Sequence, residues 1–156
     1  MPKSLYEQDF QQWIEQTIQQ LHHREFASLD IDHLIEELTD LGKSEKNALK
    51  SNLTILMAHL LKLMVQVDAP ETMKLSWYSS IDEHRQRINT SLSDTPSLKQ
   101  FLPDAIARAY LDARKLAIKE GKRATKGIQI PHETDYPIDC PFAIDQLLDE
   151  EFYGEE

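Results

Sequence analysis

The stretch LMAHLLKLM, residues 56–64, is the most apolar part of the chain, and two ionisable side chains interrupt it. These are an imidazole, His59, and an ammonium, Lys62, three residues further on. A histidine inside a helical bundle can act as a general base when a second group orients it. On a helical wheel with about 100° per residue, His59 borders the leucine stripe, where a neighbouring helix can supply a partner. Lys62 falls farther round, so we expect it to reach water.

Histidine and carboxylate side chains also suggest a metal site, with His33 and Glu37 on one helix face and Glu36 adjacent. Such ligands on facing helices can hold a divalent metal ion in a bundle. The Glu-x-x-His pairs of di-metal bundles are absent, however. If residues 31–66 form one straight helix, His33 and His59 are about 39 Å apart. We therefore expect solvated or hydrogen-bonded roles for these side chains, and no metal or other cofactor.

Two runs of charge lie towards the C-terminus. The basic run contains Arg114, Lys115, Lys119, Lys122, Arg123 and Lys126, and the acidic run contains Asp145, Asp149, Glu150, Glu151, Glu155 and Glu156. Lys122 and Arg123 are candidates for binding phosphates or an acidic partner, and the acidic run is a candidate to occupy the basic one. Solvation and interaction with the helix dipole near Gly121 are the alternative that we favour.

No familiar catalytic motif accompanies these side chains. The chain has no glycine-rich phosphate loop, paired-cysteine motif, Gly-x-Ser-x-Gly elbow or His-Glu-x-x-His sequence. Its one cysteine, Cys140, lies between Pro137 and Pro141 with no catalytic pattern around the nearest histidine, so we expect it to be packed. Familiar enzyme classes are therefore unsupported.

Composition predicts a soluble, all-helical protein. Of 156 residues, 40% are apolar and 28% charged, and four glycines are few for a β protein. The formal net charge of −10 makes nucleic-acid binding unfavourable, because an acidic surface repels phosphates. The N-terminal residues lack the apolar core of a signal peptide, and we find no run of about 18 apolar residues to cross a bilayer. We expect a cytoplasmic protein without membrane contact.

The elements that position these residues follow from hydrophobic periodicity, which predicts a single domain over residues 1–156 with four to five helices. Ser4 and Glu7 form a capping-box pattern for a first helix whose apolar face runs from Tyr6 to Leu21. Asp30 or Asp32 can cap the next helix, in which Gly42 is either the end or a tolerated interior glycine. The unbroken apolar phase favours one long central helix from about Ile31 to Gln66, with or without a kink at Gly42. Its inward stripe is expected to include Leu49, Leu53, Leu56, Leu60 and Leu63.

Prolines divide the rest of the chain. Pro70 ends the long helix, and another helix is expected from near Trp77 to Leu92. Thr95 and Pro96 begin the next, which Pro103 kinks or restarts and Gly121 closes. The bundle thus covers about residues 5–120, and residues 121–156 form an extended strap with a short helix at 142–148.

The order of several short motifs is more specific than any one of them. They are Tyr6-Glu7-x-Asp9-Phe10-x-x-Trp13, Ile35-Glu36-Glu37-Leu38, His59-Leu60-Leu61-Lys62, Ser76-Trp77, Glu83-x-Arg85 and Pro137-x-x-Cys140-Pro141. In this order they resemble family 29 of the domains of unknown function, over about residues 5–152. The resemblance implies an all-helical domain common in cyanobacteria and implies no activity. Val67 and His84 depart from the family pattern, which usually has proline and glutamine there.

The resemblance also groups His59 with Trp77, Glu83 and Arg85. If the helices pair antiparallel across residues 68–74, His59 and the early turns of the next helix approach each other. Glu83 would then orient the imidazole or pair with Arg85, and Trp77 would form the floor of a pocket. The alternative, which we favour, is a buried polar network that sets the register of the helices, with Trp77 in the core.

Two classes of function follow from these patterns. The one we favour is a non-enzymatic helical protein that binds another protein or associates with itself, because amphipathic helices and segregated charge are present without a catalytic set. The other is a metal-assisted hydrolase or nuclease-like enzyme that uses His59 with Glu83, and Arg85 as the anion-binding group.

Overall fold

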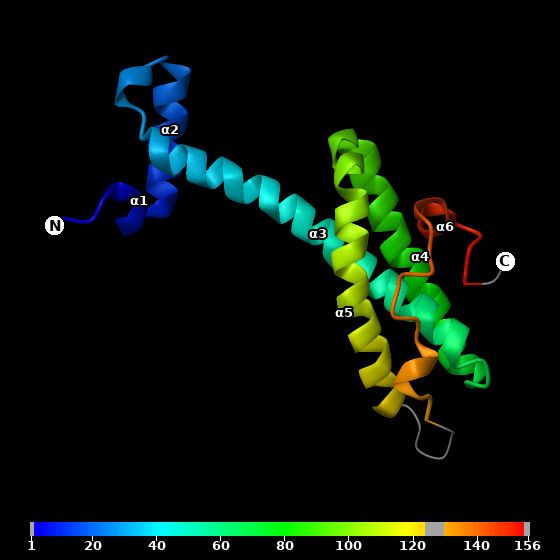
Figure 1. Cartoon of the computed structure of the whole chain (residues 1–156). Helices are drawn as coiled ribbons and strands as arrows, with labels where there is room; N and C mark the ends of the chain where they lie inside the picture. The colour runs from blue at the N-terminus through cyan, green and yellow to red at the C-terminus, as the bar shows by residue number, and fades with distance from the viewer. Residues whose placement is uncertain (1, 124–129, 155–156) are drawn as a thin grey trace. The chain divides into compact units, whose positions relative to one another are not determined.

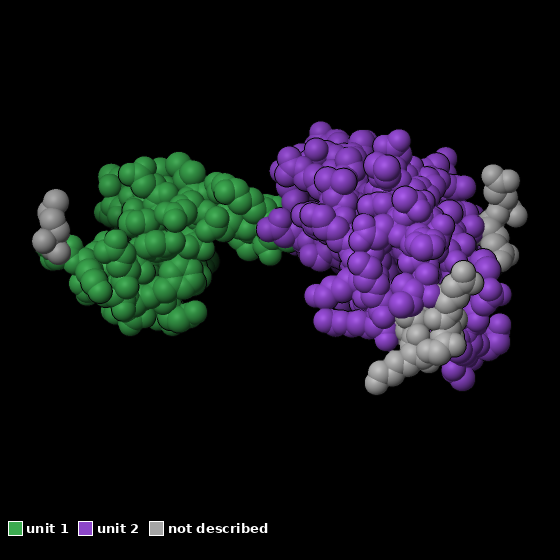
Figure 2. All heavy atoms as spheres, turned by 60° about the horizontal axis from the view of Figure 1, so that its bottom comes forward, with its two compact units in different colours: residues 1–44 green, residues 45–156 purple. Residues whose placement is uncertain are grey.

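The computed structural model describes residues 2–123 and 130–154, and every regular element in these residues is helical (Figure 1). The all-helical fold with a long central helix is as predicted, with six α-helices rather than four to five among the described residues. The chain divides into two compact units, residues 1–44 and 45–156, coloured separately in Figure 2. The single domain over residues 1–156 stays a prediction.

The N-terminal unit contains two helices where one was expected. Helix α1 (Leu5–Gln8) has the predicted capping box, in which the Glu7 amide donates to Ser4 Oγ and the Ser4 amide donates to Glu7 Oε2. Asp9 then ends α1 and caps α2 (Phe10–His22) by accepting a hydrogen bond from the Gln12 amide at 3.1 Å. The aspartate side chain competes for backbone donors, which breaks the predicted first helix.

Helix α3 (Ile31–Val65) follows the short 3-10 helix η1 (Phe26–Ser28). Asp30, rather than Asp32, caps it, with Oδ1 3.5 Å from the His33 amide nitrogen. The helix continues through Gly42, because the apolar phase on either side is unbroken and one glycine costs only about 1 kcal/mol. Four predicted core leucines, Leu49, Leu53, Leu56 and Leu60, are at most 1% exposed.

The C-terminal unit packs the second half of α3 with α4 (Glu71–Asp94) and α5 (Leu102–Arg123). Helix α4 begins at Glu71, directly after Pro70, and not near Trp77. The 3-10 helix η2 (Pro96–Phe101) precedes α5, which restarts with Pro103 in its first turn. Ala109, Ala113 and Ala117 are fully buried, as expected for close helix packing.

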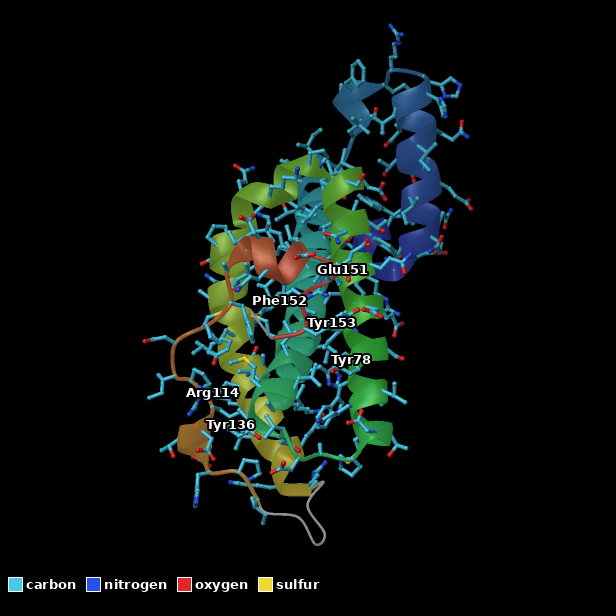
Figure 3. The ribbon with its side chains drawn as sticks, turned by 90° about the vertical axis from the view of Figure 1, so that its right-hand side faces the viewer. Tyr78, Arg114, Tyr136, Glu151, Phe152 and Tyr153 are labelled. Atoms are coloured by element: carbon cyan, nitrogen blue, oxygen red, sulfur yellow. The ribbon has the colours of Figure 1, made fainter. Side chains whose placement is uncertain are left out.

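The C-terminal strap is held by backbone carbonyls. Helix α5 continues past Gly121 to Arg123, and the described part of the strap begins at Ile130 and contains η3 (Glu133–Asp135) and α6 (Ile144–Leu148). Arg114 Nε donates to the Tyr136 carbonyl at 3.1 Å, and these residues lie together in Figure 3. Tyr110 donates to the Pro137 carbonyl. The strap therefore lies along α5.

The expectation that no segment is apolar enough to cross a bilayer was wrong. By length and composition, α3 contains a segment apolar enough to cross a bilayer, although 44% of that segment is buried inside the protein. The core helix of a soluble protein has the same properties, because its apolar face packs against neighbouring helices.

Candidate functional site

A polar strip runs along the C-terminal half of α3 and consists of His59, Lys62 and Gln66, which the helical repeat places on one side. Lys62 is 4% exposed, so the expectation that it reaches water was wrong. Its ammonium contacts the carboxylate of Glu120 on α5 and lies 5.7 Å from the centre of the Trp77 ring on α4. The lysine thus ties α3 to both neighbouring helices.

Burial controls the ionisation of the strip. It lowers the pKa of Lys62 to about 8, so the ammonium form still predominates at pH 7, where it contacts the Glu120 carboxylate. Burial, together with the charges of Lys62 and His84, lowers the pKa of His59 to about 4. Nδ1 of His59 is buried and has no hydrogen-bond partner in the described residues. His59 is therefore neutral at pH 7, and no carboxylate of the described residues binds its Nδ1.

The far end of the strip packs around Gly121. A Cβ at this position would lie 2.7 Å from the Tyr136 hydroxyl and 3.3 Å from Gln66 Nε2. Neither polar atom makes a hydrogen bond of good geometry among the described residues. Burial raises the pKa of the Tyr136 hydroxyl, and the nearby Gln66 amide opposes this rise. Only glycine leaves space for this close approach of α5 to the strap.

Glu83 does not join His59 or Arg85. Its carboxylate pairs with Arg87 at 2.5 Å on the exposed side of α4, and both side chains are 56% exposed. The neighbouring residue, His84, is the one whose charge contributes to lowering the pKa of His59. Nδ1 of His84 lies 2.8 Å from the Ser80 carbonyl. Trp77 is 6% exposed and packs as a core residue. Glu83 therefore lies on the exposed side of α4 beside Arg87, where it neither orients His59 nor pairs with Arg85.

Arg85 belongs to a different environment. It is 1% exposed, and its Nε donates to the Leu147 carbonyl at the end of α6 at 2.8 Å. Its Cζ lies 5.7 Å from the centre of the Tyr153 ring. No contact in the described residues joins Arg85 to His59, so the predicted set does not form one constellation.

The proposed metal ligands of the N-terminal unit are engaged by other side chains. His33 Nδ1 lies 2.6 Å from Asp30 Oδ2, and its ring stacks on Tyr6 at 4.0 Å. The Tyr6 hydroxyl donates to Glu37 at 2.5 Å, which raises the pKa of Tyr6 to about 12. The Asp30 hydrogen bond raises the pKa of His33. Within residues 2–123 and 130–154, no three His, Cys, Asp or Glu side chains are grouped to hold a metal ion.

Residues of the basic run on α5 bind the C-terminal strap. Lys122 Nζ lies 3.1 Å from Glu133 Oε1, and Arg114 also donates to the Glu133 carbonyl at 2.9 Å. Lys122 is thus paired with η3, and the Arg123 side chain is exposed. Lys126, Glu155 and Glu156 lie outside the described residues. Cys140 packs against the core, with Sγ 3.9 Å from Met57 Sδ, and burial raises its pKa.

Sequence reasoning missed Lys62, Gln66, Glu120 and Tyr136 as members of the polar strip. The spacing of three and four residues from His59 to Lys62 and Gln66 was the available signal for the α3 members. Glu120 and Tyr136 had no such signal, because they reach the strip only through the packing of α5 and the strap on α3.

Comparison with known proteins agrees with the pattern of motifs. The model of the family described as domain of unknown function DUF29 matches residues 5–153. No curated protein and no solved structure matches the chain significantly. Since the family match covers nearly the whole chain, the protein belongs to the DUF29 family of domains of unknown function.

Proposed function

We propose that this protein is a non-enzymatic domain of the cytosol that associates with a second copy of itself through an apolar stripe on α3. The stripe comprises Ile31, Ile35, Leu38 and Leu41, which are 48%, 56%, 60% and 65% exposed. Steps of four, three and three residues place them along one side of the helix. This exposed stripe is the observation that carries the proposal, because contiguous apolar surface of this kind marks interaction sites.

The N-terminal unit lacks a core of its own. Among residues 2–44, only Trp13 and Thr17 are buried. The same unit exposes further large apolar side chains, namely Phe10, Ile18, Leu21 and Phe26. Chain segments of about this size usually need a disulfide, a metal ion or a partner to be stable. A second copy would supply the missing apolar contacts.

Charge favours an antiparallel pair. The early part of the stripe is flanked by Asp32 and Glu36, and its end is flanked by Asp40 and followed by Lys43. In an antiparallel pair, Ile31 of one copy lies beside Leu41 of the other, so each Lys43 lies near the acidic first turn of its partner. A parallel pair would instead place the acidic turns side by side, which is unfavourable. The antiparallel pair is two-fold symmetric and therefore closes as a dimer.

Light scattering during size-exclusion chromatography tests this proposal. We expect a mass of twice the 18.1 kDa chain. Leu38→Lys should give the mass of a single chain, because it places a charge in the contact. Leu111→Lys is the matched control, since Leu111 on α5 is similarly exposed at 59%. A wild-type chain that is monomeric at all concentrations, or a Leu38→Lys chain that still doubles its mass, would contradict the proposal.

A further inference from the structure

Residues of α4 and residues that follow α6 line an open pocket of about 390 Å³. Three of its lining residues, Asp82, Arg85 and Gln86, come from α4, and the other three, Glu150, Glu151 and Tyr153, follow α6. Glu151 and Tyr153 are labelled beside Tyr78 in Figure 3. The Tyr78 and Tyr153 rings meet edge to face at 5.0 Å, which positions the last described residues over α4.

Arg85 lies at the floor of this pocket with unused donors. Nε is bonded to the Leu147 carbonyl, but Nη1 and Nη2 are buried and have no partner in the described residues. A guanidinium carries five N–H donors, and leaving a charged group buried without partners is costly. The carboxylates of Asp82, Asp149 and Glu150 act on Arg85 only from a distance, and none within the described residues forms an ion pair with it. The two Nη groups are therefore available to an acceptor from outside the described chain.

The rim of the pocket has the opposite charge. Asp82, Glu150 and Glu151 are exposed, and Asp82 accepts a hydrogen bond from the Tyr153 hydroxyl at 2.6 Å. The three carboxylates of the rim would repel a free phosphate before it reached Arg85. The guanidinium would repel a divalent cation that entered the pocket. A ligand that carries an anionic group at one end and a cationic group at the other satisfies both parts of the site.

We propose that this pocket binds an amino acid with a cationic side chain. The α-carboxylate pairs with the two Nη groups of Arg85, in the bidentate geometry that guanidinium and carboxylate favour. The cationic groups of the ligand lie among Asp82, Glu150 and Glu151. Because the Nη atoms have almost no accessible surface, the Tyr153 ring must shift when the ligand enters. Its hydroxyl is held by an exposed hydrogen bond to Asp82, and its ring packs edge to face on Tyr78.

Calorimetric titration of the full chain with L-arginine and L-lysine tests this site. We expect binding of one molecule per chain to at least one of them. Agmatine, which is arginine without its carboxylate, should bind at least tenfold more weakly, and inorganic phosphate should not bind. Absence of binding by both amino acids, or equal binding of arginine and agmatine, would overturn the proposal.

Two variants test whether the ligand binds in this pocket. Arg85→Lys should weaken binding at least tenfold, since an ammonium cannot replace the bidentate pair, and Arg87→Lys on the exposed side of the same helix is the control. Glu151→Gln is exposed and leaves the core intact, so it keeps the test valid if Arg85→Lys unfolds the protein. It should weaken binding several-fold, and binding unchanged by Glu151→Gln and Arg85→Lys would place the ligand elsewhere.

Discussion

The ammonium of Lys62 on α3 contacts the carboxylate of Glu120 on α5, inside the most apolar part of the chain. The side chain of Lys62 is 5% exposed and that of Glu120 is 41% exposed, so the lysine depends on this partner for much of its charge compensation. The contact fixes the register of α3 against α5, and the Trp77 ring covers the ammonium from α4.

Removing the carboxylate should cost more than removing the pair. Glu120→Gln leaves a buried ammonium without a counter-charge and should lower the free energy of unfolding by about 1–3 kcal/mol. Lys62→Met with Glu120→Gln removes the buried charge as well and should recover part of that loss. Urea denaturation of the two single variants and the double variant measures the coupling. Strictly additive effects would show that the contact does not stabilise the bundle.

His59 should make the protein less stable in acid. Burial lowers its pKa from 6.5 to about 4, so between these values the unfolded chain binds a proton on this residue and the folded chain does not. The contribution of His59 to stability therefore falls as pH falls through this window. The pKa of His33 is raised, so its contribution to stability changes with pH in the opposite direction. That contribution is the same in the wild type and in a variant of His59.

The variant His59→Gln, unfolded by urea at pH 4.5 and at pH 7.5, isolates this effect. We expect it to lose less stability between the two values than the wild type does. His23→Gln, at the exposed residue directly after α2, is the control. Equal losses in wild type and His59→Gln would mean that His59 is protonated as readily in the folded chain as in the unfolded one.

Two glycines offer a matched pair of substitutions. Gly121→Ala should destabilise the protein by about 1–3 kcal/mol, because its methyl group would overlap the Tyr136 hydroxyl. Gly42→Ala should stabilise it by about 0.5–1 kcal/mol, because no atom lies within 4 Å of the added group and alanine favours the helix. Thermal unfolding compares the two. Tyr136→Phe should relieve part of the cost of Gly121→Ala, and a neutral Gly121→Ala would show that the strap moves freely from α5.

The sequence allowed the helices to be predicted, but it did not predict the grouping of side chains between them. The unbroken phase from Ile35 to Leu63 predicted α3 through Gly42, and the run of alanines predicted the close packing of α5. Helix periodicity describes one helix at a time, however. It assigned Lys62 to water because the partner Glu120 lies 58 positions further along the chain. Periodicity likewise did not select Arg87 as the partner of Glu83, although Arg87 lies one turn away on the same exposed face.

Cross-linking within the apolar stripe tests self-association most directly. Chains with Ile31→Cys and with Leu41→Cys, both carrying Cys140→Ser and one carrying a mass tag, would be mixed and treated with a short bis-maleimide. The antiparallel pair predicts a mixed product that joins position 31 to position 41, with little product joining either position to itself. Absence of any cross-linked product, or products that join only like positions, would contradict association through the α3 stripe in this arrangement.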